Sequence, residues 1–197
     1  MPARALPTLA LLVVGSALAS AMESDFRVLY ERPFGDTTVS SATTSDSHRW
    51  DHAERWEAQW LAVFSVPLVA VHAGIGGVSE RRSDPGAAYK VLAGELLLGA
   101  RLTLIPEFLH LEGNGELGYG RANLDLGGQG SGQGTWKGES LGLDLVATVP
   151  IPGILTAEVG VGAGWLHGQS SHDIAGQNVD VTADNNVYGR IFVGVAF

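Results

Sequence analysis

Charged side chains recur inside otherwise apolar segments of this sequence, and they are the first residues to consider for chemistry. Three arginines and five carboxylates lie in such segments: Arg27, Arg101, Arg190, Glu95, Glu112, Glu116, Asp144 and Glu158. Ionised groups in a narrow interior must find partners or change their protonation state. We interpret this set, with His72 and His110 nearby, as a structural network of ion pairs, and a path for protons or ions is the alternative.

Residues 167–173 contain the residue types of an acyl-transfer triad, with Ser170, His172 and Asp173 close together in sequence. A triad requires three side chains that converge in space, and neighbours in one polar loop do not supply that geometry. We therefore expect a solvated external loop here and no catalytic residue.

Two further patterns have the composition of ligand sites. His48, Asp51, His52 and Glu54 would share one face only if the segment were helical. The glycine-rich run 127–134 lacks the Gly-Lys-Ser/Thr ending of a phosphate loop. We interpret both segments as solvated loops, so the sequence predicts neither a metal site nor a cofactor.

Length, charge and cysteine content narrow the class of protein. A chain of 197 residues has room for one domain, and the absence of cysteine excludes a disulfide framework. The chain has 12 Lys and Arg against 21 Asp and Glu, which gives a formal net charge of −9. Nucleic acid is therefore not an expected partner, because phosphate binding requires a basic surface.

Residues 1–21 have the layout of a cleavable secretory signal peptide. Arg4 supplies the positive charge, residues 9–18 are apolar, and 19–21 read Ala-Ser-Ala, a small-residue cleavage site. The apolar stretch is shorter than the roughly 20 residues that a spanning helix needs. We expect a mature domain of residues 22–197 that begins at Met22.

Proline turns divide this mature segment into similar units. Residues 60–78 are apolar, but Pro67 and the surrounding valines and glycines favour extended backbone over helix. Tight proline turns recur at 104–107 and 149–153, and with turn centres at Pro67, Pro106 and Ile151 they divide residues 22–197 into intervals of 45, 39, 45 and 46 residues. Each unit is long enough for two strands of ~10 residues and a loop, which predicts eight strands.

Polar segments lie about halfway between these turns and are expected to be long loops. They cover residues 36–51, 79–87, 127–135 and 170–185. Short turns at one end and longer loops at the other are typical of outer-membrane barrels, whose short turns face the periplasm.

Side chains alternate within the expected strands. In 155–165 the odd-numbered residues are apolar, while the even-numbered residues are glycine, Thr156 and Glu158, and 95–104, 109–119 and 140–148 show the same period. A soluble barrel would alternate as well, but glycine mixed with charge makes a poor dry core, whereas leucine and valine suit lipid. The sequence therefore predicts an all-β, eight-stranded antiparallel transmembrane up-and-down β-barrel.

The last eleven residues carry a resemblance to a known family. Ile191, Val193, Val195 and Phe197 place apolar residues at alternate positions before a final aromatic residue. This pattern resembles the terminal strand of Gram-negative outer-membrane β-barrel proteins, and the architecture is similar to the small eight-stranded OmpA/OmpX-like group. The resemblance implies recognition by periplasmic chaperones and the barrel-assembly machinery during export.

Aromatic residues near the strand ends should form girdles at the two membrane interfaces. The expected set is Phe26, Trp56, Phe64, Tyr119 and Trp165.

Barrels of this size are filled by side chains, which argues against a wide pore. We therefore predict a non-enzymatic, monomeric protein of the outer membrane, surrounded by its lipid, with a structural or surface-interaction role through its external loops and an unspecified ligand. A narrow channel or carrier is the first alternative, and a lipid A-modifying acyl hydrolase or transferase is the second.

Overall fold

The computed structural model describes residues 22–42, 44–66, 69–153 and 155–197. The strands are β1 Met22–Phe34, β2 Thr37–Ser41, β3 Ser45–His48, β4 His52–Val66, β5 Val69–Ser83, β6 Ala88–Ile105, β7 Leu109–Asp125, β8 Ser131–Ile151, β9 Leu155–Ile174 and β10 Gln177–Ala196, with a single 3-10 turn, η1, at Gly127–Gln129. The described part of the chain contains no helix long and apolar enough to cross a membrane. The expected signal peptide lies outside the described residues.

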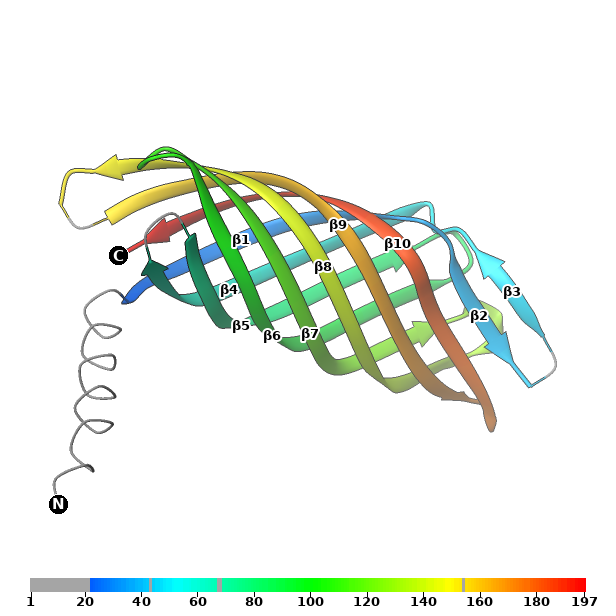
Figure 1. Ribbon diagram of the computed structural model, residues 1–197. Coiled ribbons are helices and arrows are strands. Elements are labelled where there is room, and N and C mark those ends of the chain that lie inside the picture. Colours follow the sequence, from blue (N-terminus) through cyan, green and yellow to red (C-terminus); the bar gives the residue numbers. More distant parts are fainter. Residues whose placement is uncertain (1–21, 43, 67–68, 154) are drawn as a thin grey trace, which may run out of the picture.

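Eight of these strands close into a barrel (Figure 1). They follow the order β1-β4-β5-β6-β7-β8-β9-β10, every neighbouring pair is antiparallel, and β1 also pairs with β10. In this seam Phe26 lies opposite Val195, and the backbones of Ser24 and Phe197 exchange two hydrogen bonds of 2.9 Å. The predicted eight-stranded up-and-down barrel is confirmed.

The start of β1 and the end of β10 lie at one end of the barrel, together with the tight β6–β7 turn at 106–108 and the junctions of β4 with β5 and of β8 with β9 (Figure 1). The opposite end carries the extra hairpin of β2 and β3, which continues the sheet beyond β10. There Val181 of β10 lies opposite Val39 of β2. By the rule that short turns face the periplasm, the hairpin marks the external end.

The prediction of long loops at this external end is wrong in large part. Residues 79–83, 131–135 and 170–174 are strand, and β9 and β10 meet in a two-residue turn at Ala175 and Gly176 with φ angles of 54° and 79°. Positive φ at both positions is the geometry that joins twisted antiparallel strands. The strands therefore project past the apolar wall instead of ending in flexible loops.

The two faces of the wall have the predicted polarity. Apolar side chains such as Leu98 and Val159 are 68% and 58% exposed on the outer face. Charged side chains such as Glu112 and Glu158 are buried inside. A wall that is apolar outside and charged inside suits lipid and not water, so this barrel spans a membrane.

The position of a side chain along the outer wall, from the membrane centre to its border, gives a first test that the barrel spans a membrane. Leu92 and Leu98 project from the same face of β6, but Leu98 lies in the middle of the apolar wall and Leu92 at its external border. We expect Leu98→Arg to lower the free energy of unfolding by about 2–4 kcal/mol, and Leu92→Arg by at most about 1 kcal/mol. Urea unfolding in lipid vesicles measures both, and equal costs would place this wall outside a bilayer.

Candidate functional site

A first cluster of buried charge lies in the half of the lumen nearer the tight turns. Arg27 forms ion pairs with Asp25, Glu112 and Glu158, the first and last at 3.0 Å. Arg101 reaches the same three carboxylates at 2.8 to 3.1 Å. Two guanidinium groups therefore share three carboxylates, which holds the inner faces of four strands together: β1, β6, β7 and β9.

A second cluster is centred on Arg55. Its guanidinium lies 2.8 Å from Glu31 and 2.6 Å from Glu95, with Glu57 and Glu116 at 3.8 and 3.7 Å. Oxygens of Glu57, Glu95 and Glu116 lie within 4.8 Å of one another, a spacing suited to a cation. Arg55 already supplies positive charge at this position.

Arg190 and Arg82 add contacts to the second cluster, and Arg82 lies nearer the external end. Arg190 donates to Asp144 over 2.6 Å and forms an ion pair with Glu116 at 3.0 Å. Arg82 donates to Glu80 over 2.5 Å and to the hydroxyl of Thr37 at the start of β2 over 2.7 Å. The network thus reaches the base of the external hairpin.

All eight charged residues singled out in the sequence face the lumen and take part in these contacts. Six further members were missed: Asp25, Glu31, Arg55, Glu57, Glu80 and Arg82. The signal that could have found them is the same two-residue period, because Asp25, Arg27 and Glu31 alternate with outward Phe26 and Tyr30.

An apolar cluster fills the barrel above the charged lumen. Its buried members are Trp50, Tyr89, Val91, Ala93, Ala122, Leu124, Trp136, Ile174, Val179 and Val181. The inner face thus changes from charged to apolar as the strands leave the membrane. This cluster separates the ion network from the external mouth.

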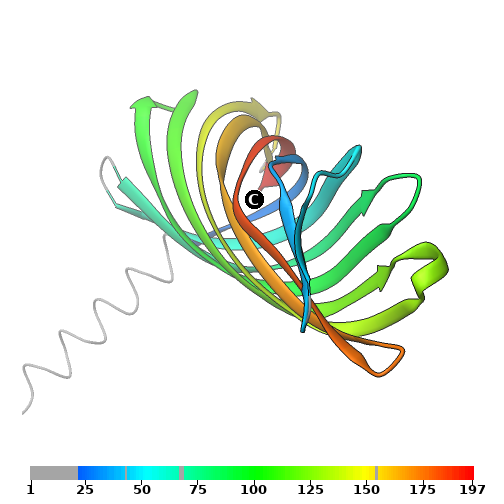
Figure 2. The same cartoon turned by 90° about the vertical axis from the view of Figure 1, so that its right-hand side faces the viewer.

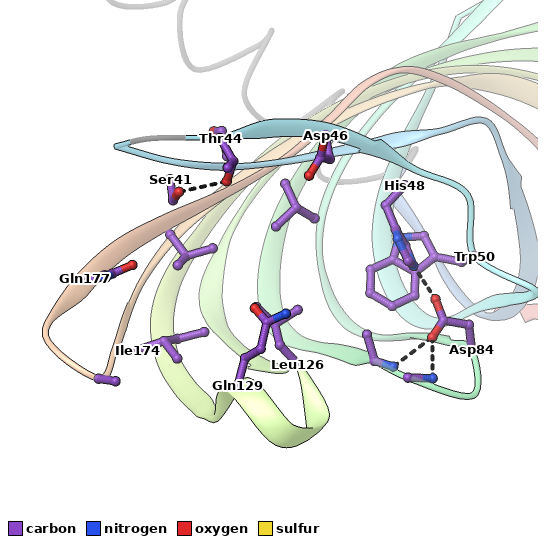
Figure 3. Close-up of a pocket in the computed structure, with 16 residues that line it drawn as sticks. Ser41, Thr44, Asp46, His48, Trp50, Asp84, Leu126, Gln129, Ile174 and Gln177 are labelled. Atoms are coloured by element: carbon purple, nitrogen blue, oxygen red, sulfur yellow. Dashed lines mark hydrogen bonds and ion pairs between the residues drawn. The ribbon is translucent and has the colours of Figure 1, made fainter.

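The external mouth holds a pocket of about 590 Å³ directly above the apolar cluster (Figure 3). Five segments line it: the β2–β3 hairpin, the β3–β4 connection, the β5–β6 loop, the turn η1 and the β9–β10 turn. Ser41, Thr44, Gln129 and Gln177 bring hydroxyl and amide groups, while Trp50 lies at its inner side. We call this cavity the mouth pocket.

A contact between His48 and Asp84 fastens the hairpin to the opposite rim. The His48 ring is hydrogen-bonded through Nε2 to the Asp84 carboxylate, which also accepts the backbone N–H groups of Gly86 and Ala87 at 2.8 and 2.7 Å. Burial by itself would raise the pKa of Asp84, but these donors outweigh it and hold the pKa below its ordinary value. Asp84 is therefore a carboxylate at neutral pH.

Charge and hydrogen-bonding capacity define what the mouth pocket accepts. Asp46 and Asp84 contribute carboxylates, and no lysine or arginine occurs among the described residues that line it. Trp50 is 8% exposed, and its indole N–H has no hydrogen-bond partner among the described residues. A buried donor without a partner favours a ligand that brings an acceptor.

The structure does not bring the triad-like residues together, and segment 167–173 is strand β9 instead of the expected loop. Ser170 and His172 face inward, with 2.8 Å between the hydroxyl and Nε2, and the hydroxyl also lies 2.9 Å from Tyr89. Asp173 is exposed on the opposite face of the strand. Ser170 and His172 are both buried in the upper lumen. His172 contacts the backbone carbonyl of Gly132, and no carboxylate among the described residues contacts its ring.

The histidine-rich segment likewise does not form one ligand face. It is not helical, because β3 ends at His48 and β4 begins at His52. His48 turns into the mouth pocket, whereas Asp51, His52 and Glu54 are exposed. The glycine-rich run is not one loop either, because η1 occupies 127–129 and β8 begins at Ser131.

The expected girdle aromatics lie on the outer wall. Phe26, Trp56 and Tyr119 are 45%, 50% and 63% exposed, and Phe64 and Trp165 are half-buried. Trp56 packs against Tyr30 across the β1–β4 pair with ring centroids 4.9 Å apart, a contact that the sequence pattern did not suggest.

The terminal residues singled out in the sequence also project outward. Ile191, Val193, Val195 and Phe197 are 59%, 61%, 37% and 56% exposed, so their apolar side chains face lipid.

No protein-family model matches the sequence, and no curated protein matches it. Among solved structures, the chain is similar to the outer membrane protein OprG from Pseudomonas aeruginosa, with 15% identity over 90% of this chain and 96% of that chain and a TM-score of 0.49. It is similar to Neisserial surface protein A, with 12% identity, coverage of 89% and 96% and a TM-score of 0.48. It is also similar to Ail, the attachment invasion locus protein of Yersinia pestis, with 16% identity, coverage of 89% and 98% and a TM-score of 0.44.

The chain's own features establish its fold. Its eight strands close in sequence order, its outer wall is apolar and its lumen is filled with ion pairs. By these features the chain has the fold of the small OmpA/OmpX-like outer-membrane β-barrels.

Proposed function

We propose that this chain is a non-enzymatic outer-membrane protein that binds a partner at the cell surface through its mouth pocket. The observation that carries the proposal is the pocket itself, about 590 Å³ of space built from five external segments. This volume lies within the range of small-molecule sites, and polar groups over an apolar floor are the usual composition of such sites.

The ligand that fits best is small, polar, and neutral or cationic. Asp46 and Asp84 attract positive charge and repel anions. Trp50 brings an indole N–H that has no partner among the described residues and can donate to a ligand oxygen. A sugar or the basic side chain of a protein partner has this chemistry.

The filled lumen supports surface binding over the channel alternative. Arg27, Arg55 and Glu112 are at most 1% exposed, and the apolar cluster lies between them and the mouth. A solute path would require both layers to move. The buried Ser170 and His172 similarly give little support to an acyl hydrolase or transferase.

The proposal is tested by titrating the detergent-folded protein with three probes: arginine amide, a neutral disaccharide and citrate. We expect arginine amide or the disaccharide to change the tryptophan emission, and citrate to leave it unchanged. The response should disappear in Trp50→Phe, and the response to arginine amide should weaken in Asp46→Asn/Asp84→Asn.

Glu139→Gln is the matched control, because Glu139 is an exposed carboxylate of β8 that does not line the pocket. It should respond like the unaltered protein. Binding of citrate alone, or an unchanged response to arginine amide in the Asp46→Asn/Asp84→Asn variant, would contradict the proposed site.

The outward apolar face of the terminal strand supports the expected recognition by chaperones and the barrel-assembly machinery. We propose that the chain is inserted by this machinery as a monomer in contact with outer-membrane lipid.

A further inference from the structure

Basic residues on the outer wall are confined to its external end. The outward basic side chains of the described strands are Arg32, Arg81, Lys90, Arg121 and Lys137, and all are exposed. The charged residues exposed near the tight-turn end are Glu23 and Glu107, both acidic. In this acidic protein, the outward basic residues of the described strands therefore lie at one membrane interface.

Four of these side chains form a continuous row across β5, β6, β7 and β8. Arg81 lies directly opposite Lys90. Arg121 lies opposite Leu92, and Lys137 lies opposite Tyr119, so each is one diagonal step from the preceding member. Diagonal neighbours on one face are about 7–8 Å apart, within reach of long side chains. We call Arg81, Lys90, Arg121 and Lys137 the basic ridge.

The side chains of the basic ridge form no ion pair within the part of the chain that the structure describes. Like charges directly opposite each other destabilise an antiparallel pair, yet Arg81 and Lys90 occupy such positions. No ion pair to any of the four occurs among the described residues, although Glu54 lies opposite Arg81 and Glu139 is two residues from Lys137. In the lumen, by contrast, every arginine contacts a carboxylate.

The ridge borders the lipid-facing wall. Leu92, Leu117 and Tyr119, the neighbours on its membrane side, are 63–70% exposed. Side chains at this border reach the layer of lipid headgroups. An anionic membrane surface attracts each cation near it, so four adjacent cations would select anionic lipids strongly.

We propose that the basic ridge binds the phosphate groups of anionic lipid headgroups in the outer leaflet. The arginines fit phosphate oxygens with paired donors, and the lysines add point charge. Leu92 and Tyr119 below the ridge would contact the acyl chains of the same lipid. This site is separate from the mouth pocket and does not depend on it.

The experiment uses protein folded in zwitterionic nanodiscs doped with either phosphatidylglycerol or additional phosphatidylcholine of the same acyl chains. Native mass spectrometry after release counts the retained lipids. We expect phosphatidylglycerol to be retained, and Arg81→Gln/Lys90→Gln/Arg121→Gln/Lys137→Gln to bind it at least about tenfold more weakly. Heat-modifiable mobility on gels shows that each variant is folded.

Three controls separate the possible outcomes. The charge-conserving variant Arg81→Lys/Lys90→Arg/Arg121→Lys/Lys137→Arg should retain the lipid, and Arg32→Gln/Arg49→Gln, which removes exposed charge outside the ridge, should bind normally. Inorganic phosphate at millimolar concentration should not displace the lipid. Equal retention by the glutamine variant, equal loss in the Arg32→Gln/Arg49→Gln control, or complete displacement by free phosphate would overturn the proposal.

Discussion

Deletion of residues 195–197 is expected to abolish barrel formation. These residues close the seam: Phe197 exchanges two backbone hydrogen bonds with Ser24, Ala196 lies opposite Asp25, and Val195 opposite Phe26. Without them, one edge of β1 would expose unpaired backbone groups to lipid, at several kcal/mol for each group. We expect no heat-modifiable species in membranes, as measured by gels of boiled and unboiled samples.

Phe197→Ser distinguishes loss of backbone pairing from loss of the terminal aromatic group. This variant retains every hydrogen bond of the seam but removes the apolar side chain that resembles an assembly signal. Normal folding into vesicles in vitro, combined with poor assembly in cells, would indicate recognition by the assembly machinery. Assembly of the truncated protein at normal levels would contradict the closed seam.

Arg27→Gln is expected to lower the free energy of unfolding by about 3–5 kcal/mol. Arg27 is 1% exposed and contacts Asp25, Glu112 and Glu158. Its removal leaves three buried carboxylates to share Arg101 alone, and uncompensated buried charge is costly. Urea unfolding in vesicles, followed by tryptophan fluorescence, measures the change.

Arg32→Gln is the matched control, because Arg32 lies on the same strand but faces outward. It is exposed and contacts the ring of Phe34 at 5.8 Å. An exposed contact of this kind contributes about 0.5–1 kcal/mol. Similar losses in the two variants would show that the buried network does not stabilise the barrel.

Strand number and facing could be predicted from the sequence because both follow a simple period. The lipid-facing wall requires an apolar residue at every second position, as at Leu141, Leu143 and Leu145, and the tight turns require proline or glycine between such runs. Closure of β1 on β10 followed from the same reasoning, since a membrane barrel has no free edge.

The external strand extensions could not be predicted in the same way. Residues 170–185 are rich in serine, aspartate and asparagine, which favours a loop. Only the inward positions show the strand, because Ile174, Val179 and Val181 pack into the apolar cluster. In the sequence, polar outward residues stand between these apolar residues and obscure their alternation.

The mouth pocket depends on contacts that no sequence period encodes. His48 and Asp84 are 36 residues apart and meet only because the β2–β3 hairpin folds over the rim (Figure 2).

The role of the inward glycines could not be predicted from the sequence either. A Cβ at Gly160 would overlap the ring of Phe192. Glycine there leaves room for a large side chain from the adjacent strand, a reason that only the assembled barrel reveals.

Ion conductance across planar lipid bilayers tests most directly whether the protein acts at its surface and not through its lumen. The buried ion network and the apolar cluster above it leave no open path in the described structure. Purified, heat-modifiable protein should therefore leave the bilayer as resistive as lipid alone over a wide range of voltage. Stable single-channel steps that shift in size in Arg55→Gln or Arg190→Gln would contradict a sealed lumen and favour a channel.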